Sequence, residues 1–368
     1  MTGFCLSVLV AAVLGAPAIV AQGTPGKPKK PPISTAPWPD DETIATRRAA
    51  AEDRALFRDD RPLAFTMTAD LSSMNREREV TKSYSGVLTV DGTDIPIVIG
   101  PRGHFRLKIQ TCDFVPIRLQ FAPTANLATT VFDGQSTLRL GTHCRDERES
   151  DQYVTREYLA YKLAHLVTPM SFRARLAAVT YVDAKSKKTI GTHRGLLLER
   201  EADVAQRLGG REVKVPHMLF DAFDADSLTT MGLVEYMLGN TDFSVWGLHN
   251  VIVVQDKRRR FYPVPYDFDL SGLVHAPYAT YDPRLPVKSV TDRLYRGPCR
   301  TVEQLDAAAA PFRAQQSAML STVDASDLDA AHRKEVKSYL ESFFRRVATK
   351  QAIKSTFVDG CPANRVRI

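Results

Sequence analysis

Alternating apolar and polar positions dominate the first half of the chain. In residues 63–69, Leu63, Phe65, Met67 and Ala69 alternate with polar or smaller residues, which is typical of a strand with one buried face. The same period of two predicts strands at 104–109, 116–121, 136–142, 174–183 and 189–199. Residues 84–90 and 94–99 flank Asp91-Gly92 and predict a hairpin with a type I′ turn.

A helical period replaces this alternation at residues 153–166, where an apolar stripe recurs every three to four positions. Further helices are predicted at 40–58, at 227–239 and over most of 302–354, and two short strands at 249–254 and 261–265. A sheet with one helix is thus followed by helices with one small hairpin. This order predicts an α+β fold: an antiparallel β-rich N-lobe with one helix over 40–200, and a mainly helical C-lobe over 201–368.

The N-terminus has the features of an export signal. Residues 4–20 form an apolar run followed by small residues, so residues 1–21 are predicted to be a cleaved signal peptide. Residues 22–39 are rich in Pro, Gly and Lys and predict a flexible linker. A secreted or periplasmic location follows, with no stable membrane span left after cleavage.

Cysteine usage agrees with export. Four cysteines remain after residue 21, and an even number in an exported chain suggests two disulfides, for which three connectivities exist. We favour the pairing local in sequence, Cys112 with Cys144 and Cys299 with Cys361. The spacing of the cysteines does not fit a structural zinc site.

Amino-acid composition excludes some classes of protein but does not by itself indicate a function. Of the 368 residues, 44% are hydrophobic and 25% are charged, which excludes a fibrous or wholly disordered chain. The formal net charge of +7 fits an acidic or phosphorylated ligand. Because the basic residues are scattered rather than clustered, nucleic-acid binding is not expected.

Polar residues that can carry chemistry gather around the small hairpin. Gly239-Asn240-Thr241-Asp242 follows a helix, His249-Asn250 precedes the first strand, and Tyr266-Asp267-Phe268-Asp269 follows the second. The hairpin topology brings Asp242, Asn250 and Asp267 to one end. Two carboxylates and an amide oxygen suit phosphoryl transfer, in which one carboxylate accepts a proton and the others hold Mg²⁺.

These motifs resemble the catalytic region of the spore coat H (CotH) kinase-like family of atypical, often secreted kinases. Upstream stretches around Arg102, Arg118, Leu138–Ala160 and 189–199 also resemble strands and a helix of that family, over roughly residues 85–275. The resemblance implies a two-lobed protein-kinase-like fold, with ATP and Mg²⁺ or Mn²⁺ as cofactors and a protein hydroxyl in the envelope or outside the cell as acceptor.

The resemblance also implies roles for individual residues. Asp242 would be the catalytic base, and Asp267 would be a metal ligand. Asn250 and Asp269 would be further candidate metal ligands. Arg118 and Arg102 would bind phosphate, and Glu199 would lie near the adenine. Glu157 would pair with such a cation, with Glu147 and Glu149 as competing candidates. His249 is expected to be structural.

A second interpretation stays open. The sequence has no glycine-rich GxGxxG loop, and Arg118 stands where a kinase has a lysine. Asp242 and Asn250 can be turn residues, Glu157 can lie on a solvated helix face and Arg118 can point to solvent from its strand. The alternative is therefore a catalytically inactive binding or structural module of the cell envelope.

Overall fold

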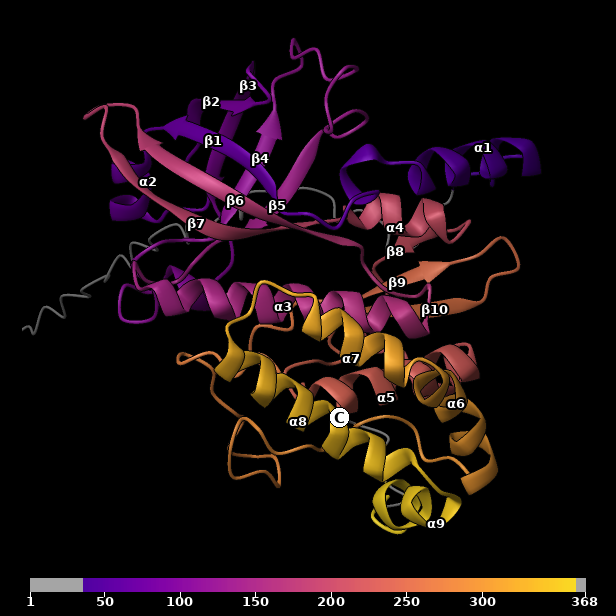
Figure 1. Cartoon of the computed structure of the whole chain (residues 1–368). Coiled ribbons are helices and arrows are strands. Elements are labelled where there is room, and N and C mark those ends of the chain that lie inside the picture. Colours follow the sequence, from indigo (N-terminus) through magenta and orange to yellow (C-terminus); the bar gives the residue numbers. More distant parts are fainter. Residues whose placement is uncertain (1–35, 362–368) are drawn as a thin grey trace, which may run out of the picture.

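The computed structural model describes residues 36–361. The predicted signal peptide, 1–21, and most of the predicted linker, 22–39, lie outside the described residues. The remaining chain forms a β-barrel, a mainly helical layer and one long helix between them (Figure 1).

Seven strands form a closed barrel. Around the barrel their order is β1-β2-β3-β4-β5-β7-β6. Their bounds are β1 Leu63–Ala69, β2 Tyr84–Val90, β3 Thr93–Pro101, β4 Ile117–Phe121, β5 Thr137–Gly141, β6 Ala174–Asp183 and β7 Thr189–Leu198. Asp91 and Gly92 both have positive φ angles, 48° and 75°, as the predicted type I′ turn between β2 and β3 requires.

The predicted fold class is wrong. Strand β1 pairs with β6 in parallel, from Leu63 opposite Ala177 to Ala69 opposite Asp183. This pairing closes a mixed seven-stranded barrel, so the molecule does not have the predicted two-lobed protein-kinase-like fold with an antiparallel β N-lobe. Alternation in the sequence shows that a strand has a buried face, but it does not show which strand lies beside it, and this pair is separated by over a hundred residues.

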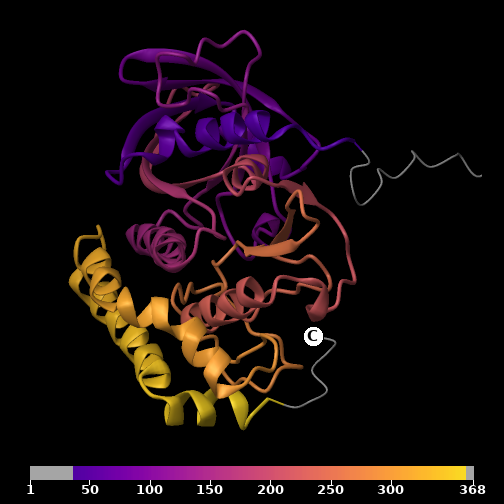
Figure 2. The same ribbon diagram turned by 90° about the vertical axis from the view of Figure 1, so that its right-hand side faces the viewer.

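Helices cover the barrel and build the second layer. Their bounds are α1 Asp41–Glu52, α2 Leu71–Glu77, α3 Arg148–Val167, α4 Glu201–Arg207, α5 Ala225–Leu238, α6 Val302–Ala314, α7 Gln316–Asp324, α8 Ala330–Val347 and α9 Lys350–Ile353. A three-stranded sheet of order β10-β9-β8 combines β8 Arg211–Val213 with β9 Val251–Gln255 and β10 Phe261–Pro265. Helix α3 lies between the barrel and the helices α5, α7 and α8 in both views (Figures 1 and 2).

Two large apolar cores follow from this layering. One fills the barrel interior and includes Met67, Ile99 and Leu119, all completely buried. The other joins α3 to α5, α8 and the C-terminal helices through residues such as Leu163, Leu238 and Phe343. The cavity described below lies where the two layers meet, so each layer holds one of its walls rigidly.

Both predicted disulfides are confirmed. Cys112 is bonded to Cys144 and Cys299 to Cys361. Disulfides of this kind fit an extracellular or periplasmic protein. Between residues 36 and 361, none of the helices has the length and apolar character that a membrane span requires.

The strand predicted at 104–109 is wrong. This segment instead contains one short helical turn, Phe105–Leu107. Its burial is also the reverse of the prediction, since Arg106 is buried while Phe105 is 36% and Ile109 58% exposed. The reason lies in the charges that surround Arg106, which are described next.

Candidate functional site

The hairpin β9–β10 brings the polar motifs together. Helix α5 ends at Gly239, whose φ of 65° turns the chain away from the helix axis. Strand β9 pairs antiparallel with β10, with Val251 opposite Pro265, so the residues just outside this pair are neighbours. The backbone N–H of Tyr266 donates to the carbonyl of Asn250 at 2.9 Å. Asn250 and Asp267 therefore lie at the same end of the hairpin, as the sequence predicts.

Asp242 is held by three side chains. The Nδ2 of Asn250 donates to its backbone oxygen at 2.7 Å and to its Oδ2 at 3.1 Å. The Nε2 of His249 lies 3.1 Å from Oδ1, and the Oδ1 of Asn240 accepts from the Asp242 N–H at 3.1 Å. The Asp242 carboxylate raises the pKa of His249. His249, expected to be structural, thus contacts the predicted base directly.

Asp267 and Asp269 come just after the returning strand β10, which ends at Pro265. Asp267 has a φ of 64° and Asn250 a φ of 54°, a left-handed conformation that Asn and Asp tolerate better than other side chains. The Asp267 N–H donates to the Tyr161 hydroxyl oxygen at 2.8 Å, so helix α3 fixes this turn. The hydroxyl of Tyr278 donates to Asp269 Oδ2 at 3.3 Å.

A cavity of about 350 Å³ collects most of the predicted site. Its lining includes six of the eight predicted residues: Asp242, Asn250, Asp267, Asp269, Glu157 and Arg102. Carboxylates come from the helical layer and from α3, while Arg102 comes from the end of β3. No hydrogen bond or ion pair of the Arg102 side chain is found within residues 36–361, so its guanidinium is available to a ligand.

The two other predicted residues lie outside this cavity. Arg118 donates to the carbonyl of Val80 at 3.2 Å and to Ser83 Oγ at 3.3 Å, which turns its guanidinium toward the β2 edge. The Glu199 carboxylate is buried and forms ion pairs with Arg173 and Arg207 at 2.9 and 3.1 Å. Arg118 and Glu199 instead line a neighbouring pocket, which Arg102 shares.

Arg106 is the site residue that sequence reasoning missed. It is 91% buried, its Nη2 donates to the Thr142 carbonyl at 2.6 Å, and its guanidinium carbon lies 5.4 Å from the centre of the Tyr278 ring. Its positive charge lowers the pKa values of Glu157 and Asp269, against the larger opposing effect of burial. An arginine between two apolar alternating positions gives no sequence signal, because its burial depends on carboxylates more than fifty residues away.

Burial and mutual repulsion disfavour the charged forms of two carboxyl groups in the cavity. Burial, together with the neighbouring Asp267, raises the pKa of Asp269 to about 7. Burial and the charges of Asp269 and Asp267 raise the pKa of Glu157 well above its usual value. Glu157 is buried, with only 8% of its surface exposed. Within the described part of the chain, its carboxylate nevertheless has no hydrogen-bond or ion-pair partner. Such a group calls for a proton or a cation.

The residues suit a metal that is bound together with phosphate. Among residues 36–361, no three His, Cys, Asp or Glu side chains form a ready-made metal cluster. Mg²⁺, however, is commonly held by one or two carboxylates with substrate phosphate and water completing its shell. Asp267 and Asp269 supply the carboxylates. The Oδ1 of Asn250 is available as a further ligand because its Nδ2 makes both hydrogen bonds to Asp242.

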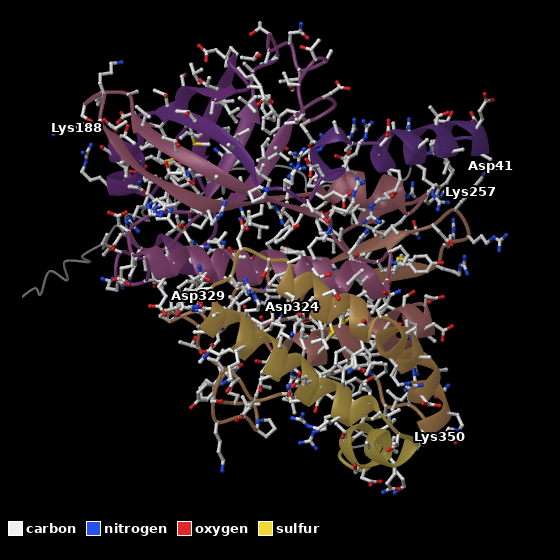
Figure 3. The ribbon with its side chains drawn as sticks, in the orientation of Figure 1. Asp41, Lys188, Lys257, Asp324, Asp329 and Lys350 are labelled. Carbon is white, nitrogen blue, oxygen red and sulfur yellow. A yellow bond between two sulfur atoms is a disulfide. The ribbon has the colours of Figure 1, made fainter. Side chains whose placement is uncertain are left out.

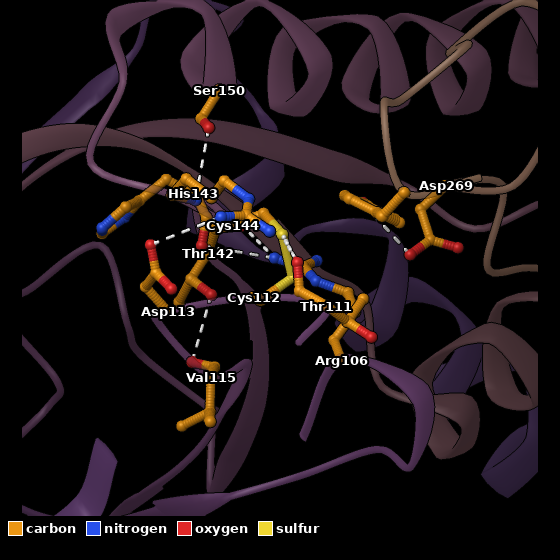
Figure 4. Close-up of a disulfide and its surroundings, with 12 residues drawn as sticks. Arg106, Thr111, Cys112, Asp113, Val115, Thr142, His143, Cys144, Ser150 and Asp269 are labelled. Atoms are coloured by element: carbon orange, nitrogen blue, oxygen red, sulfur yellow. Dashed lines mark hydrogen bonds and ion pairs between the residues drawn. A yellow bond between two sulfur atoms is a disulfide. The ribbon is translucent and has the colours of Figure 1, made fainter. Parts of the chain in front are cut away.

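The Cys112–Cys144 disulfide lies beside the segment that holds the buried Arg106 guanidinium. Figure 4 shows Arg106 between the Cys112–Cys144 bond and Asp269. The carbonyls of Thr142 and His143, which accept from Arg106, immediately precede Cys144. The Cys144 carbonyl also accepts from the N–H groups of Asp113 and Phe114. The disulfide therefore fixes the segment that holds the buried cation.

The comparisons with known proteins add no assignment. No protein-family model matches the chain, and no curated protein matches it. The chemistry of the cavity residues is therefore the main guide to function.

Proposed function

We propose that this protein is a phosphotransferase that uses ATP and Mg²⁺ or Mn²⁺ to phosphorylate a hydroxyl group of an extracytoplasmic protein. The observation that carries the proposal is the cavity in which Asp242, Asn250, Asp267 and Asp269 face Arg102 and Arg106. Carboxylates that pair with no lysine or arginine among the described residues lie on one side, and the guanidinium of Arg102 lies on the other, which suits a ligand with both a cation and phosphates. The motif resemblance to the CotH family supports the same chemistry.

Each residue has a specific task in this reaction. Asp242, held by His249 and Asn250, would accept the proton of the acceptor hydroxyl. As that oxygen forms a bond to the terminal phosphorus, the bond from phosphorus to the leaving phosphate oxygen breaks, which leaves ADP. Arg102 would bind the phosphates. A divalent cation held by Asp267, Asp269 and Asn250 would supply neutralisation of the phosphate charge.

A catalytically inactive module is the second candidate, and one observation favours it. Arg118, at the position where a kinase has its phosphate-binding lysine, is hydrogen-bonded to Val80 and Ser83 instead of facing the cavity. A protein that binds a nucleotide or an envelope partner without transfer would tolerate this arrangement.

Labelling with γ-labelled ATP and Mn²⁺ tests the proposal. The wild-type protein is incubated with candidate acceptor proteins beside Asp242→Ala and Asp267→Ala. Asp221→Ala, an exposed carboxylate outside the cavity, is the control. We expect label with wild type and control only. Equal label in all four proteins would overturn the proposed reaction.

A thermal shift distinguishes the two candidates. A nucleotide at a hundredfold excess over its dissociation constant stabilises a protein by about 2.7 kcal/mol. We expect ATP with Mn²⁺ to raise the melting temperature of the wild type. A rise without label transfer would favour the inactive nucleotide-binding module, and no rise would favour a module that binds only envelope partners.

A further inference from the structure

A second hollow lies along helix α8. It is separate from the cavity lined by Asp242, Asp267 and Asp269, which we call the carboxylate cavity. It has a volume of about 620 Å³, and it shares no lining residue with that cavity. One wall is the segment 272–275 with Thr291, and the other is one face of α8. The α8 wall consists of Ala331, Lys334, Glu335, Ser338, Tyr339, Ser342 and Arg345. We call this hollow the α8 groove.

The spacing of these residues makes the groove elongated. They recur every three to four positions, so they form one stripe beside the core-facing stripe that contains Leu340 and Phe343. Arg345 follows Lys334 by eleven positions, which at a rise of 1.5 Å per residue is about 16 Å. An extended peptide rises about 3.3 Å per residue, so about five residues fit between these two cations.

The lining of the α8 groove carries a net positive charge. Lys334 and Arg345 are exposed, and neither forms an ion pair with any described side chain. Arg156 forms part of the floor; it is 2% exposed, and its Nε has no hydrogen-bond partner within the described part of the chain. Glu335 is the lining carboxylate, and it is already paired with Arg156. His275 adds a further titratable group at the edge.

Another arginine lies beneath the groove. Arg293 donates from Nη1 to Ser342 Oγ at 2.6 Å and from Nη2 to the Tyr339 carbonyl at 2.7 Å. Its guanidinium carbon lies 3.6 Å from the centre of the Tyr339 ring, and its hydrogen bonds are to neutral groups. The nearby carboxylate of Asp292 accepts from the N–H groups of Lys288 and Ser289, which draws it to its own turn. Among residues 36–361, therefore, no carboxylate forms an ion pair with the guanidinium beneath the groove.

We propose that the α8 groove binds an extended, acidic segment of a partner protein, about five residues long. Charge complementarity carries the inference, because Lys334 and Arg345 bracket the groove without ion pairs among the described residues and the buried guanidiniums of Arg156 and Arg293 lie beneath it. The ends of this chain are poor occupants, since residues 1–35 and 362–368 contain lysine or arginine but no aspartate or glutamate. The proposal does not depend on phosphoryl transfer.

Peptide binding without nucleotide or metal tests this proposal. The full-length protein is titrated into a fluorescent peptide with a Glu-Asp-Glu-Asp-Glu core, and fluorescence anisotropy is followed at low and physiological salt. The comparison peptide has a Gln-Asn-Gln-Asn-Gln core. We expect the acidic peptide to bind at least tenfold more tightly, and Lys334→Glu with Arg345→Glu to reduce its affinity at least tenfold.

A charge-matched control separates the groove from overall charge. Lys188→Glu with Lys350→Glu makes the same change in net charge at exposed lysines outside the groove, which lie far from each other (Figure 3). We expect this control to keep its affinity within twofold. Equal weakening by both double variants, or equal binding of both peptides, would overturn the proposal whether or not the protein transfers phosphate.

Discussion

The two walls of the carboxylate cavity carry opposite charges. The barrel side contributes Arg102 after β3 and Arg106 in the following turn, whereas the hairpin side contributes Asp242, Asp267 and Asp269. By contrast, the buried carboxylate of Glu199 is paired directly with Arg173 and Arg207. The difference indicates that the carboxylates of Asp242, Asp267 and Asp269 are not paired with Arg102 to hold the fold together. They are available to a ligand that itself contains both signs of charge.

The largest expected effect concerns the carboxylate side. Asp267→Asn keeps the shape of the side chain but removes a metal ligand, so we expect phosphoryl transfer to fall at least a thousandfold, about 4 kcal/mol of barrier. Because Asp267 raises the pKa values of Asp269 and Glu157, its neutralisation relieves repulsion, and we expect no loss of stability. Label transfer and urea unfolding measure the two effects. A substantial loss of stability would assign Asp267 to the fold instead.

Removal of the buried Arg106 guanidinium should, unlike Asp267→Asn, reduce the stability of the fold. Arg106→Met leaves Glu157 and Asp269 without their buried positive neighbour, so we expect the free energy of unfolding to fall by about 3–5 kcal/mol. Arg284→Met, at an exposed pair with Asp282, is the control and should lose less than about 1 kcal/mol. Equal losses would mean that Arg106 does not compensate the carboxylates.

The two disulfides allow the same comparison between regions. Each closes a loop, over 32 and 62 residues, and removal of a native disulfide typically costs about 2–5 kcal/mol. We expect both double Cys→Ser variants to lose stability to this extent. Only Cys112→Ser with Cys144→Ser, which releases the Arg106 segment, should also weaken Mn²⁺–ATP binding. Isothermal titration at a temperature where both variants are folded checks this, and equal affinities would contradict it.

Two arginines sharpen the comparison on the barrel side. Arg102→Ala should weaken nucleotide binding about tenfold, or about 1.4 kcal/mol, because its guanidinium lines the cavity and has no partner in the part of the chain that the structure describes. Arg118→Ala should change it less than about twofold, since that side chain is bound to Val80 and Ser83. The reverse order of effects, measured by titration, would restore the role that the sequence suggested for Arg118.

The smallest effect concerns pH. Asp269 has a folded pKa of about 7, well above that of an unfolded chain, so its contribution to stability is present at low pH and is lost as pH rises toward 7. Without metal, stability should decline from pH 5 to pH 8. Mn²⁺ needs ionised carboxylates, so its stabilising effect should be larger at pH 8 than at pH 5, by about 2 °C in melting temperature. A metal effect that does not change with pH would exclude Asp269 as a ligand.

Local features of the fold could be predicted from the sequence. Period-two patterns located β1, β4, β6 and β7, and Asp91-Gly92 specified the β2–β3 turn. The convergence of Asp242, Asn250 and Asp267 was also predictable, because a hairpin brings its two flanks together whatever surrounds it. These predictions concern residues close in sequence, for which the hydrophobic pattern and the turn residues determine the local backbone structure.

Long-range features could not be predicted in this way. The parallel pair β1–β6 depends on how the barrel closes, which no single strand's pattern encodes. Burial of Arg106 depends on distant carboxylates, and the alternation of Phe105, Leu107 and Ile109 indicated the opposite face. The contact of His249 with Asp242 depends on the conformation of the loop between them, which the sequence pattern does not show.

Barrel closure also sets an order of events during synthesis. Strand β1 ends at Ala69, but its parallel partner β6 is complete only at Asp183. At typical ribosomal rates of about 5–20 residues per second, roughly ten seconds pass between the two. During that interval one edge of β1 has no partner, and an unpaired edge is a template for wrong association. A holding chaperone that binds the nascent N-terminal strands would therefore raise the yield of folded protein more than one that acts after residue 183.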